Sequence, residues 1–156
     1  MSDDHRKQFW DRLESIRTGM LEIDGRFLPM SHNLAPEDGN IWFITAQGTA
    51  MADAAAAGET ARYVISGDGN GLYASINGGL EISNDPERLE QVWNFIASSW
   101  FEDGKRDDDL VLIRYRPANA EVWLTGKSGL GFLYQVAKAH VTGDKPDMGV
   151  HTLLTF

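Results

Sequence analysis

Few side chains in this sequence have the types and spacing that chemistry needs. The four histidines, His5, His32, His140 and His151, are scattered, and none forms the close helical or strand pair that metal sites use. The chain has no cysteine, which excludes a thiolate nucleophile, a disulfide and a cysteine-based metal site. We therefore predict no metal centre, and we interpret each histidine as a surface or core residue.

Two glycine-rich motifs look like ligand loops but lack essential residues. The segment 126–128, Gly-Lys-Ser, resembles the end of a phosphate-binding loop, yet Glu121 stands where that pattern needs its first glycine. The segment 67–71, Gly-Asp-Gly-Asn-Gly, resembles part of a calcium loop without the later glutamate and the flanking helices. We interpret the first as a strand-to-helix turn and the second as a hairpin connection. The acidic run 107–109 is interpreted as a solvated loop.

The stretch 26–51 is the most informative part of the chain. Residues 26–30 and the apolar run 41–45 both have the pattern of strands. Thr49 is a candidate N-cap for a short alanine-rich helix over 50–57. Side-chain alternation places Arg26, Leu28 and Met30 on one face of the first strand and Phe27 and Pro29 on the other. Two strands and a helix start therefore follow one another closely, and the other strands complete their sheet.

The remaining elements follow from periodicity and turn residues. Asp24 and Gly25 form a two-residue hairpin signal. Asp85 as N-cap and Pro86 at the first helical position open a helix whose apolar stripe continues to Trp100. The other predicted helices are 4–17 and 130–141. Further strands are expected at 20–23, 61–66, 72–76, 80–83, 110–115 and 120–125. The glycines of 77–79 predict a break in the form of a bulge or a close backbone approach, Pro117 predicts a break, and 148–156 predicts a short strand or a docked terminus.

This inventory predicts a mainly β fold with peripheral helices, an antiparallel barrel rather than a Rossmann sheet, because few strand–helix–strand units are present. The length of 156 residues favours a single domain, 1–156. No internal repeat or low-complexity linker indicates a second domain.

Composition limits the partners. The formal net charge of −9 and the absence of a Lys/Arg run argue against nucleic acid, which needs a cationic face. No apolar stretch approaches the roughly 20 residues that span a bilayer, and the N-terminus lacks the pattern of a signal peptide. We therefore expect a cytoplasmic protein with no membrane partner.

Several motifs recur in a familiar order. They are Phe9-Trp10, Pro29-Met30, the Trp-Phe-Ile-Thr of 42–45, the segment 100–104 and the late segment 117–123. In that order, from about Phe9 to about Gly143, the chain resembles the FMN-binding split barrels related to pyridoxamine 5'-phosphate oxidase, and in particular their general stress protein branch.

The resemblance implies an antiparallel split β-barrel that forms a homodimer, with flavin mononucleotide (FMN) at the subunit interface and a small molecule as substrate or ligand. Trp123 is the candidate aromatic residue that the partner contributes to the flavin. The cofactor-binding residues that the resemblance implies within one subunit are Arg26, Leu28, Pro29, Met30, Ile44, Thr45, Thr49, Ala50 and Met51.

Two positions depart from the family pattern. Leu28 stands where the family usually has an arginine before Pro-Met, and Met51 stands where it usually has a lysine. Those cations ordinarily neutralise the flavin phosphate, and each charge-assisted hydrogen bond contributes roughly 1.5–3 kcal/mol. Arg26, Arg62 and Lys127 are candidate replacements.

Three hypotheses follow. The first is an FMN-binding general stress-type protein, an FMN-dependent oxidoreductase acting on a small molecule, for which no catalytic residue can be named. The second is a non-enzymatic dimeric binding module that keeps the fold but has lost or altered flavin binding, motivated by Leu28 and Met51. The third is an unrelated small β-barrel binding domain.

Overall fold

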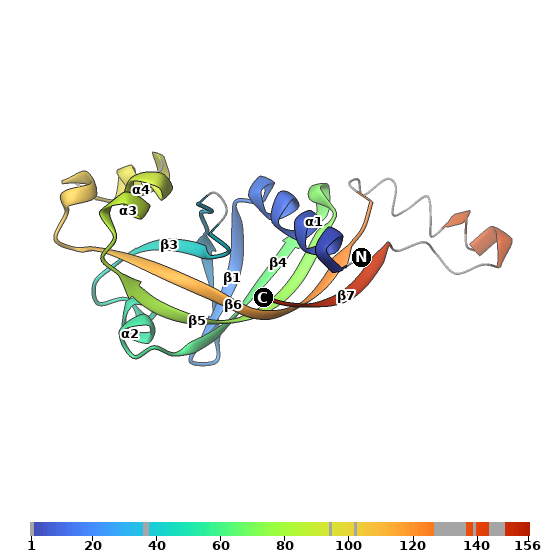
Figure 1. Cartoon of the computed structure of the whole chain (residues 1–156), viewed down its shortest axis with the longest axis horizontal. Coiled ribbons are helices and arrows are strands. Elements are labelled where there is room, and N and C mark those ends of the chain that lie inside the picture. The colour runs from blue at the N-terminus through green and yellow to red at the C-terminus, as the bar shows by residue number, and fades with distance from the viewer. Residues whose placement is uncertain are drawn as a thin grey trace.

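The computed structural model describes residues 2–35, 38–93, 95–101, 103–126, 137–138, 140–143 and 149–156. Seven strands form one sheet in the order β2-β1-β4-β5-β6-β3, with β7 also paired to β6. All neighbouring strands are antiparallel, and the sheet curls into an open half-barrel (Figure 1). The predicted antiparallel split-barrel fold is confirmed. The strands are β1 (Thr18–Ile23), β2 (Arg26–Ser31), β3 (Ile41–Ala46), β4 (Thr60–Gly67), β5 (Leu72–Ser83), β6 (Leu110–Leu124) and β7 (Val150–Thr155).

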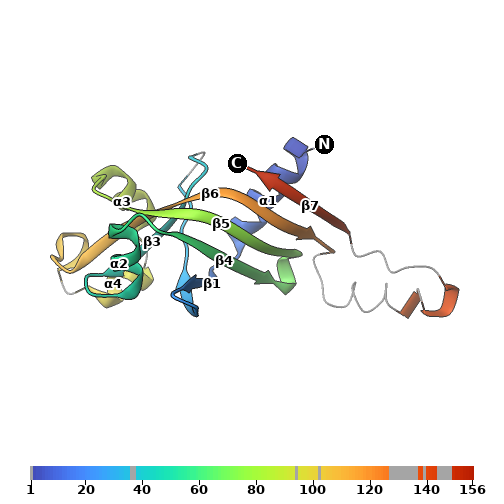
Figure 2. The ribbon, with the colours of Figure 1, turned by 90° about the horizontal axis from the view of Figure 1, so that it is seen from below.

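The helices lie at opposite ends of the curled sheet (Figures 1 and 2). Helix α1 (Ser2–Ser15) lies near β7, whereas α2 (Ala50–Ala56), α3 (Pro86–Val92) and α4 (Phe95–Trp100) gather at the other end. Two 3₁₀ turns, η1 (Asp68–Asn70) and η2 (Gly104–Arg106), complete the described elements. Most of the predicted helix 130–141 lies outside the described residues, although 137–138 and 140–142 are helical.

The β1–β2 hairpin forms where the Asp-Gly signal predicted it. Asp24 and Gly25 have φ values of 52° and 77°, the left-handed conformation that a tight hairpin turn requires. The register pairs Met20 with Pro29 and Leu21 with Leu28. This turn places the Pro29-Met30 segment at the edge of the sheet.

Strand β5 carries the bulge and close backbone approach that the sequence predicted at 77–79, whereas β6 runs through Pro117 without the predicted break. A register shift between Asn77 and Gly78 absorbs the irregularity as a bulge. Pro117 lies between the stretch of β6 that pairs with β3 and the stretch that pairs with β7, so its missing N–H removes no hydrogen bond from either ladder. Gly78 is required here because an added Cβ would lie 2.6 Å from the Arg116 carbonyl oxygen.

The predicted long helix after Pro86 is wrong: the chain divides it into α3 and α4. Asp85 does cap α3, because its carboxylate accepts hydrogen bonds from the backbone N–H groups of Glu87 and Arg88. Trp93 then adopts an extended conformation with ψ 132°, which ends α3. Its ring packs against Phe101 at a centroid distance of 6.3 Å, and this contact accompanies the turn into α4.

The main core fills the concave side of the sheet with aromatic and aliphatic side chains. The Phe43 ring lies 5.1 Å from the Tyr63 ring and 6.1 Å from the Tyr115 ring. A smaller cluster of Ala35, Trp42, Val92 and Leu112 joins α3 to the sheet. These two clusters hold together the elements that surround the candidate site.

Helix α1 is anchored to segments far away in the sequence. The Arg12 guanidinium donates hydrogen bonds to the carbonyl oxygens of Gly71 at 2.7 Å and Thr125 at 2.8 Å. The Phe9 ring lies 5.5 Å from the ring of Phe156 at the chain end. The first helix is therefore fixed by the β4–β5 connection, by the end of β6 and by the C-terminus.

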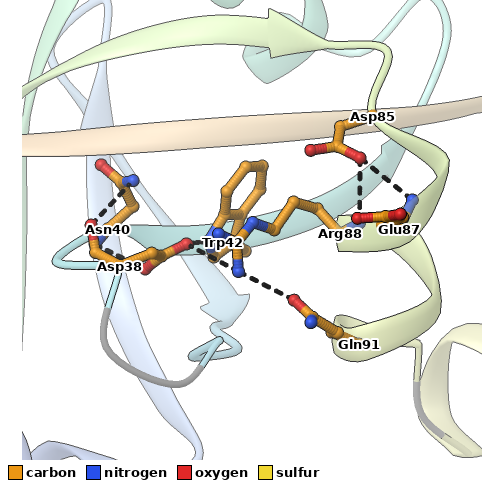
Figure 3. Close-up of polar contacts among 7 residues, drawn as sticks. All are labelled: Asp38, Asn40, Trp42, Asp85, Glu87, Arg88 and Gln91. Carbon is orange, nitrogen blue, oxygen red and sulfur yellow. Dashed lines mark hydrogen bonds and ion pairs between the residues drawn. The ribbon is translucent and has the colours of Figure 1, made fainter.

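A polar network anchors α3 to the loop before β3 (Figure 3). The indole N–H of Trp42 donates to Asp38 Oδ2 at 2.7 Å, and the Asn40 backbone N–H donates to Asp38 Oδ1 at 2.9 Å. Arg88 lies 3.7 Å from the same Asp38 carboxylate and donates to Gln91 at 2.8 Å. Since Asp38 accepts from both neighbours and faces a guanidinium, its buried charge is well compensated.

Candidate functional site

A cavity of about 450 Å³ lies between β2, the end of β3 and α4. This volume falls in the range of small-molecule sites. One part of its wall is apolar and comes from three elements and the residue after α4: Pro29, Met30, Ile44, Ala46, Ala97 and Phe101. Such a wall fits the faces of a flat aromatic ligand.

Neutral polar groups form a second part of the wall. They are the hydroxyls of Ser31, Thr45 and Thr49 and the amide of Asn33. The Thr49 hydroxyl donates to the Ala46 carbonyl oxygen at 2.9 Å, accepts from the Ala52 backbone N–H at 3.2 Å, and lies 3.2 Å from the Thr45 hydroxyl. Thr49 therefore caps α2 as predicted and also fixes the edge of the cavity.

Two acidic residues, Asp107 and Asp109, also line the cavity. Asp107 accepts hydrogen bonds from the backbone N–H groups of Asp109 at 2.9 Å and Asp103 at 3.3 Å. The backbone carbonyl of Asp109 accepts from the Gln47 N–H at 2.8 Å, which fixes this turn against the end of β3. In the part of the chain that the structure describes, no lysine or arginine side chain lines the cavity.

The structure brings half of the predicted site residues together. Pro29, Met30, Ile44, Thr45 and Thr49 all line this one cavity. They meet because β2 and β3 end near the start of α2. Their role as ligand contacts stays a prediction.

Four other predicted residues of the same stretch do not line the cavity. Arg26 is exposed at the start of β2, and Ala50 is exposed at the start of α2. Leu28 is half-buried and packs against the main core, while Met51 is only 2% exposed and belongs to that core. The two positions that depart from the family pattern are therefore filled by side chains packed into or against the apolar interior.

Trp123 lies on β6, away from the cavity. Its neighbours Val122 and Leu124 point into the core at 0% and 3% exposure, so Trp123 points to the opposite face of the sheet. Its ring stacks on His151 of β7 at 4.9 Å with an interplanar angle of 5°. His151 also forms a 2.8 Å contact with Glu121. Within one chain, Trp123 contributes nothing to the cavity wall.

Sequence reasoning missed the contributions of α4 and the turn that follows it. Ala97, Phe101, Asp107 and Asp109 line the cavity, and so do Ser31 and Asn33 after the Pro29-Met30 pair. The resemblance of the segment 100–104 to the family was the one signal for this region. That resemblance did not identify any site residue, because the break between α3 and α4 was not predicted.

His32 is a buried structural residue rather than a ligand contact. It is 6% exposed, its Nδ1 lies 2.6 Å from the Tyr63 hydroxyl, and its Nε2 lies 3.3 Å from the Leu13 carbonyl oxygen. Burial lowers the pKa of His32 below its ordinary value, and the charge of Arg17 lowers it further, against backbone hydrogen bonds at Leu13 and Ile16 that raise it. Burial also raises the pKa of Tyr63, so its hydroxyl stays protonated.

The described residues were also compared with the requirements of metal sites and of membrane-spanning helices. The described residues include no group of three or more His, Cys, Asp or Glu side chains that could hold a metal ion. Among the helices of the described ranges, none has the length and apolar character needed to cross a bilayer.

Comparison with known proteins identifies relatives along the whole chain. Residues 4–147 match the family described as pyridoxamine 5'-phosphate oxidase like. No curated protein matches the chain. A structure from Jannaschia sp. CCS1, described as a general stress protein 26, is 46% identical, covers 100% of both chains and superposes with a TM-score of 0.91.

Two structures from Xanthomonas are more distant relatives. A general stress family protein from Xanthomonas campestris pv. campestris is 33% identical over 82% of this chain and 92% of its own, with a TM-score of 0.72. The general stress FMN/FAD binding protein from Xanthomonas citri is 33% identical over 81% of this chain and 92% of its own, with a TM-score of 0.71.

Proposed function

Because the chain belongs to the pyridoxamine 5'-phosphate oxidase-like family, in its general stress protein branch, we propose that it binds a flavin in the cavity between β2, β3 and α4. The observation that carries this proposal is the composition of the cavity wall. Apolar side chains such as Ile44 and Phe101 fit the flat isoalloxazine ring, and the hydroxyls of Thr45 and Thr49 fit its polar edge. The description of the Xanthomonas citri relative as an FMN/FAD binding protein supports the same ligand class.

FMN is the flavin that the sequence resemblance implies, and its ring and its phosphate need different surroundings. The ring fits the wall described above. The phosphate does not, because Asp107 and Asp109 are the only charged side chains among the described residues of the wall. Leu28 and Met51, which replace the expected cations, pack into or against the core instead.

The proposed assembly is a homodimer with the flavin at the interface. The position of Trp123 supports it, since this ring lies on the face of the sheet opposite the core and not in the cavity of its own chain. The Trp123 ring of a second copy would then cover the flavin from the other side, as large aromatic side chains do at interfaces.

The proposed activity is that of a flavin-dependent oxidoreductase acting on a small molecule. A bound flavin supplies the redox chemistry, while the protein binds it, orients it and excludes water. The contribution of this chain is the apolar part of the wall and a fixed hydroxyl edge, held by the hydrogen bonds of Thr49 to Ala46 and Ala52.

The second candidate function is a non-enzymatic dimeric binding module. The burial of Met51 at 2% exposure favours it, because a core side chain now stands where the family usually has a cation. This candidate predicts that the cavity holds a ligand without redox turnover.

A visible absorption spectrum of the freshly purified full chain tests the first proposal. It is repeated after addition of excess FMN or riboflavin and desalting, and light scattering of the same sample reports the oligomeric state. Retained flavin absorbance with a dimeric mass supports the proposal. A colourless protein that shows no saturable response to either flavin would overturn it.

A matched pair of variants tests whether the flavin binds in this cavity. Ala46→Phe adds a ring to the cavity wall, whereas Ala57→Phe adds the same ring at an exposed position at the end of α2. We expect the first variant to lose most flavin binding and the second to keep it. Equal retention by both variants, with unchanged circular dichroism, would mean that the flavin binds elsewhere.

A further inference from the structure

The cavity between β2, β3 and α4 has an unbalanced negative charge. Its described charged residues are the carboxylates Asp107 and Asp109, and the rest of its described wall is neutral. The Asp107 carboxylate is partly neutralised by two backbone N–H groups, those of Asp109 and Asp103. The Asp109 side chain is exposed, so its charge acts through solvent as well as through the cavity.

Three cations near this end of the molecule form ion pairs with carboxylates outside the cavity wall. Arg114 forms an ion pair with Glu81, and Lys105 forms one with Glu90 at 2.6 Å. Arg88 lies against Asp38 and Gln91 in the network of Figure 3. Each of these side chains would have to leave a carboxylate to reach a ligand phosphate.

Three exposed arginines on the β1–β2 side, Arg17, Arg26 and Arg62, are also not among the described residues of the cavity wall. Arg26 lies at the start of β2 and is exposed, and Arg62 lines a different cavity together with Glu22, Asp24 and Glu59. The formal net charge of −9 adds a general repulsion for anions. A terminal phosphate carries a charge of about −1.5 to −2 at neutral pH, so these surroundings disfavour it.

The neutral part of the wall favours uncharged ligand groups. The hydroxyls of Ser31, Thr45 and Thr49 and the amide of Asn33 donate and accept hydrogen bonds without charge. These groups suit the edge of an uncharged heterocycle and the hydroxyls of an uncharged side chain. A ligand with a ring and hydroxyls but no phosphate places no negative charge against Asp107 and Asp109.

We propose that this cavity selects flavins that lack a terminal phosphate, so that riboflavin binds more tightly than FMN. The inference rests on the flavin-binding function proposed above and specifies its ligand. The selection comes from repulsion between the phosphate and the carboxylates of Asp107 and Asp109, together with the neutral hydroxyl edge around Thr45.

Fluorescence titration of the full chain tests this selection, because riboflavin and FMN share the same fluorescent ring. At low ionic strength we expect riboflavin to bind at least about tenfold more tightly, a difference of about 1.4 kcal/mol. Added salt screens repulsion between charges, so the FMN affinity should rise with salt while the riboflavin affinity stays constant.

Two isosteric variants separate the cavity charge from the total charge. Asp109→Asn removes a carboxylate from the wall, and Asp108→Asn removes its exposed neighbour, which does not line the cavity. We expect Asp109→Asn to raise the ratio of FMN affinity to riboflavin affinity by roughly threefold or more. Asp108→Asn should change neither affinity by more than about twofold.

The outcomes distinguish this inference from the function on which it rests. FMN binding as tight as or tighter than riboflavin binding would overturn the selection and leave flavin binding intact. Equal effects of Asp109→Asn and Asp108→Asn would also overturn it, because the total charge would then explain the preference. Failure of both flavins to bind would overturn the proposed function itself.

Discussion

His32 Nδ1 lies 2.6 Å from the Tyr63 hydroxyl oxygen, and this buried contact joins the end of β2 to β4. The Leu13 carbonyl, 3.3 Å from Nε2, only accepts, so Nε2 carries a proton. In the neutral ring Nδ1 is therefore the acceptor, and Tyr63 donates to it. A charged His32 would reverse this bond and turn the Tyr63 proton toward the Met30 carbonyl, 3.3 Å away.

This arrangement predicts an acid-sensitive fold. Because the pKa of His32 is lowered in the folded protein, the unfolded chain binds more protons once the pH falls below about 6.5, the ordinary histidine value. The stability contributed by neutral His32 is present above that pH and declines below it, by up to about 1.4 kcal/mol per pH unit. Urea unfolding measured from about pH 7.5 to about pH 5 checks the slope.

A histidine pair supplies the control for that slope. His32→Gln should flatten the decline in unfolding free energy, whereas His151→Gln, at an exposed position beside Trp123, should preserve it. An unchanged slope in His32→Gln would assign the acid sensitivity to other groups.

Met51 and Leu28 should respond differently to a cation. Met51→Lys places an ammonium group at a position that is 2% exposed, and an uncompensated buried charge costs about 3 kcal/mol or more. Leu28 is half-buried, so the guanidinium of Leu28→Arg can extend to solvent. The loss of unfolding free energy should then stay near about 1 kcal/mol. Urea unfolding of the two variants measures the difference, and a Met51→Lys protein as stable as the native chain would contradict the core placement.

Two adjacent glycines in β5 should tolerate alanine unequally. The Cβ of Gly78→Ala would lie 2.6 Å from the Arg116 carbonyl and 2.8 Å from the Tyr115 ring, whereas that of Gly79→Ala meets nothing within 4 Å. We expect Gly78→Ala to cost about 1–3 kcal/mol. Gly79→Ala should stay within about 0.5 kcal/mol of the native protein. Thermal unfolding checks the pair, and equal costs would argue against close packing at the bulge.

Thr49 should stabilise both α2 and the cavity edge through one oxygen. Thr49→Ala removes the acceptor for the Ala52 N–H and the donor to the Ala46 carbonyl, at a cost of about 1 kcal/mol. Thr49→Ser keeps the oxygen and should retain most of the stability. Urea unfolding gives both values, and similar losses in the two variants would show that the methyl group, not the cap, is what matters.

The parts of the fold that follow local rules were predictable from sequence. The Asp24-Gly25 turn, the Asp85 cap and the Thr49 cap depend on neighbouring residues only, and each occurs as expected. Pro29, Met30, Thr45 and Thr49 meet because consecutive elements carry them. The far wall was not predictable, since Ala97, Phe101 and Asp109 reach the cavity through a break at Trp93 that no glycine or proline announces.

The orientation of α2 also could not be predicted from the sequence. Its sequence consists mostly of alanine, so it offers little contrast between an apolar and a polar face, and the burial of Met51 beside the exposed Ala50 could not be deduced from periodicity. Pro117 predicts a strand break from its sequence alone. Only the pairing pattern reveals that on one edge of β6 it lies between the partners β3 and β7, while on the other edge it pairs with Gly78 of β5.

The anchoring of α1 also determines when this protein can fold. Arg12 needs the carbonyl groups of Gly71 and Thr125, and Phe9 needs the ring of Phe156, so the partners of the first helix are made 59, 113 and 147 residues later. Contacts of such long sequence separation slow folding, because much of the chain must be ordered before they form. During synthesis, α1 is therefore made before all three of these partners, and its packing is complete only after Phe156 has been added.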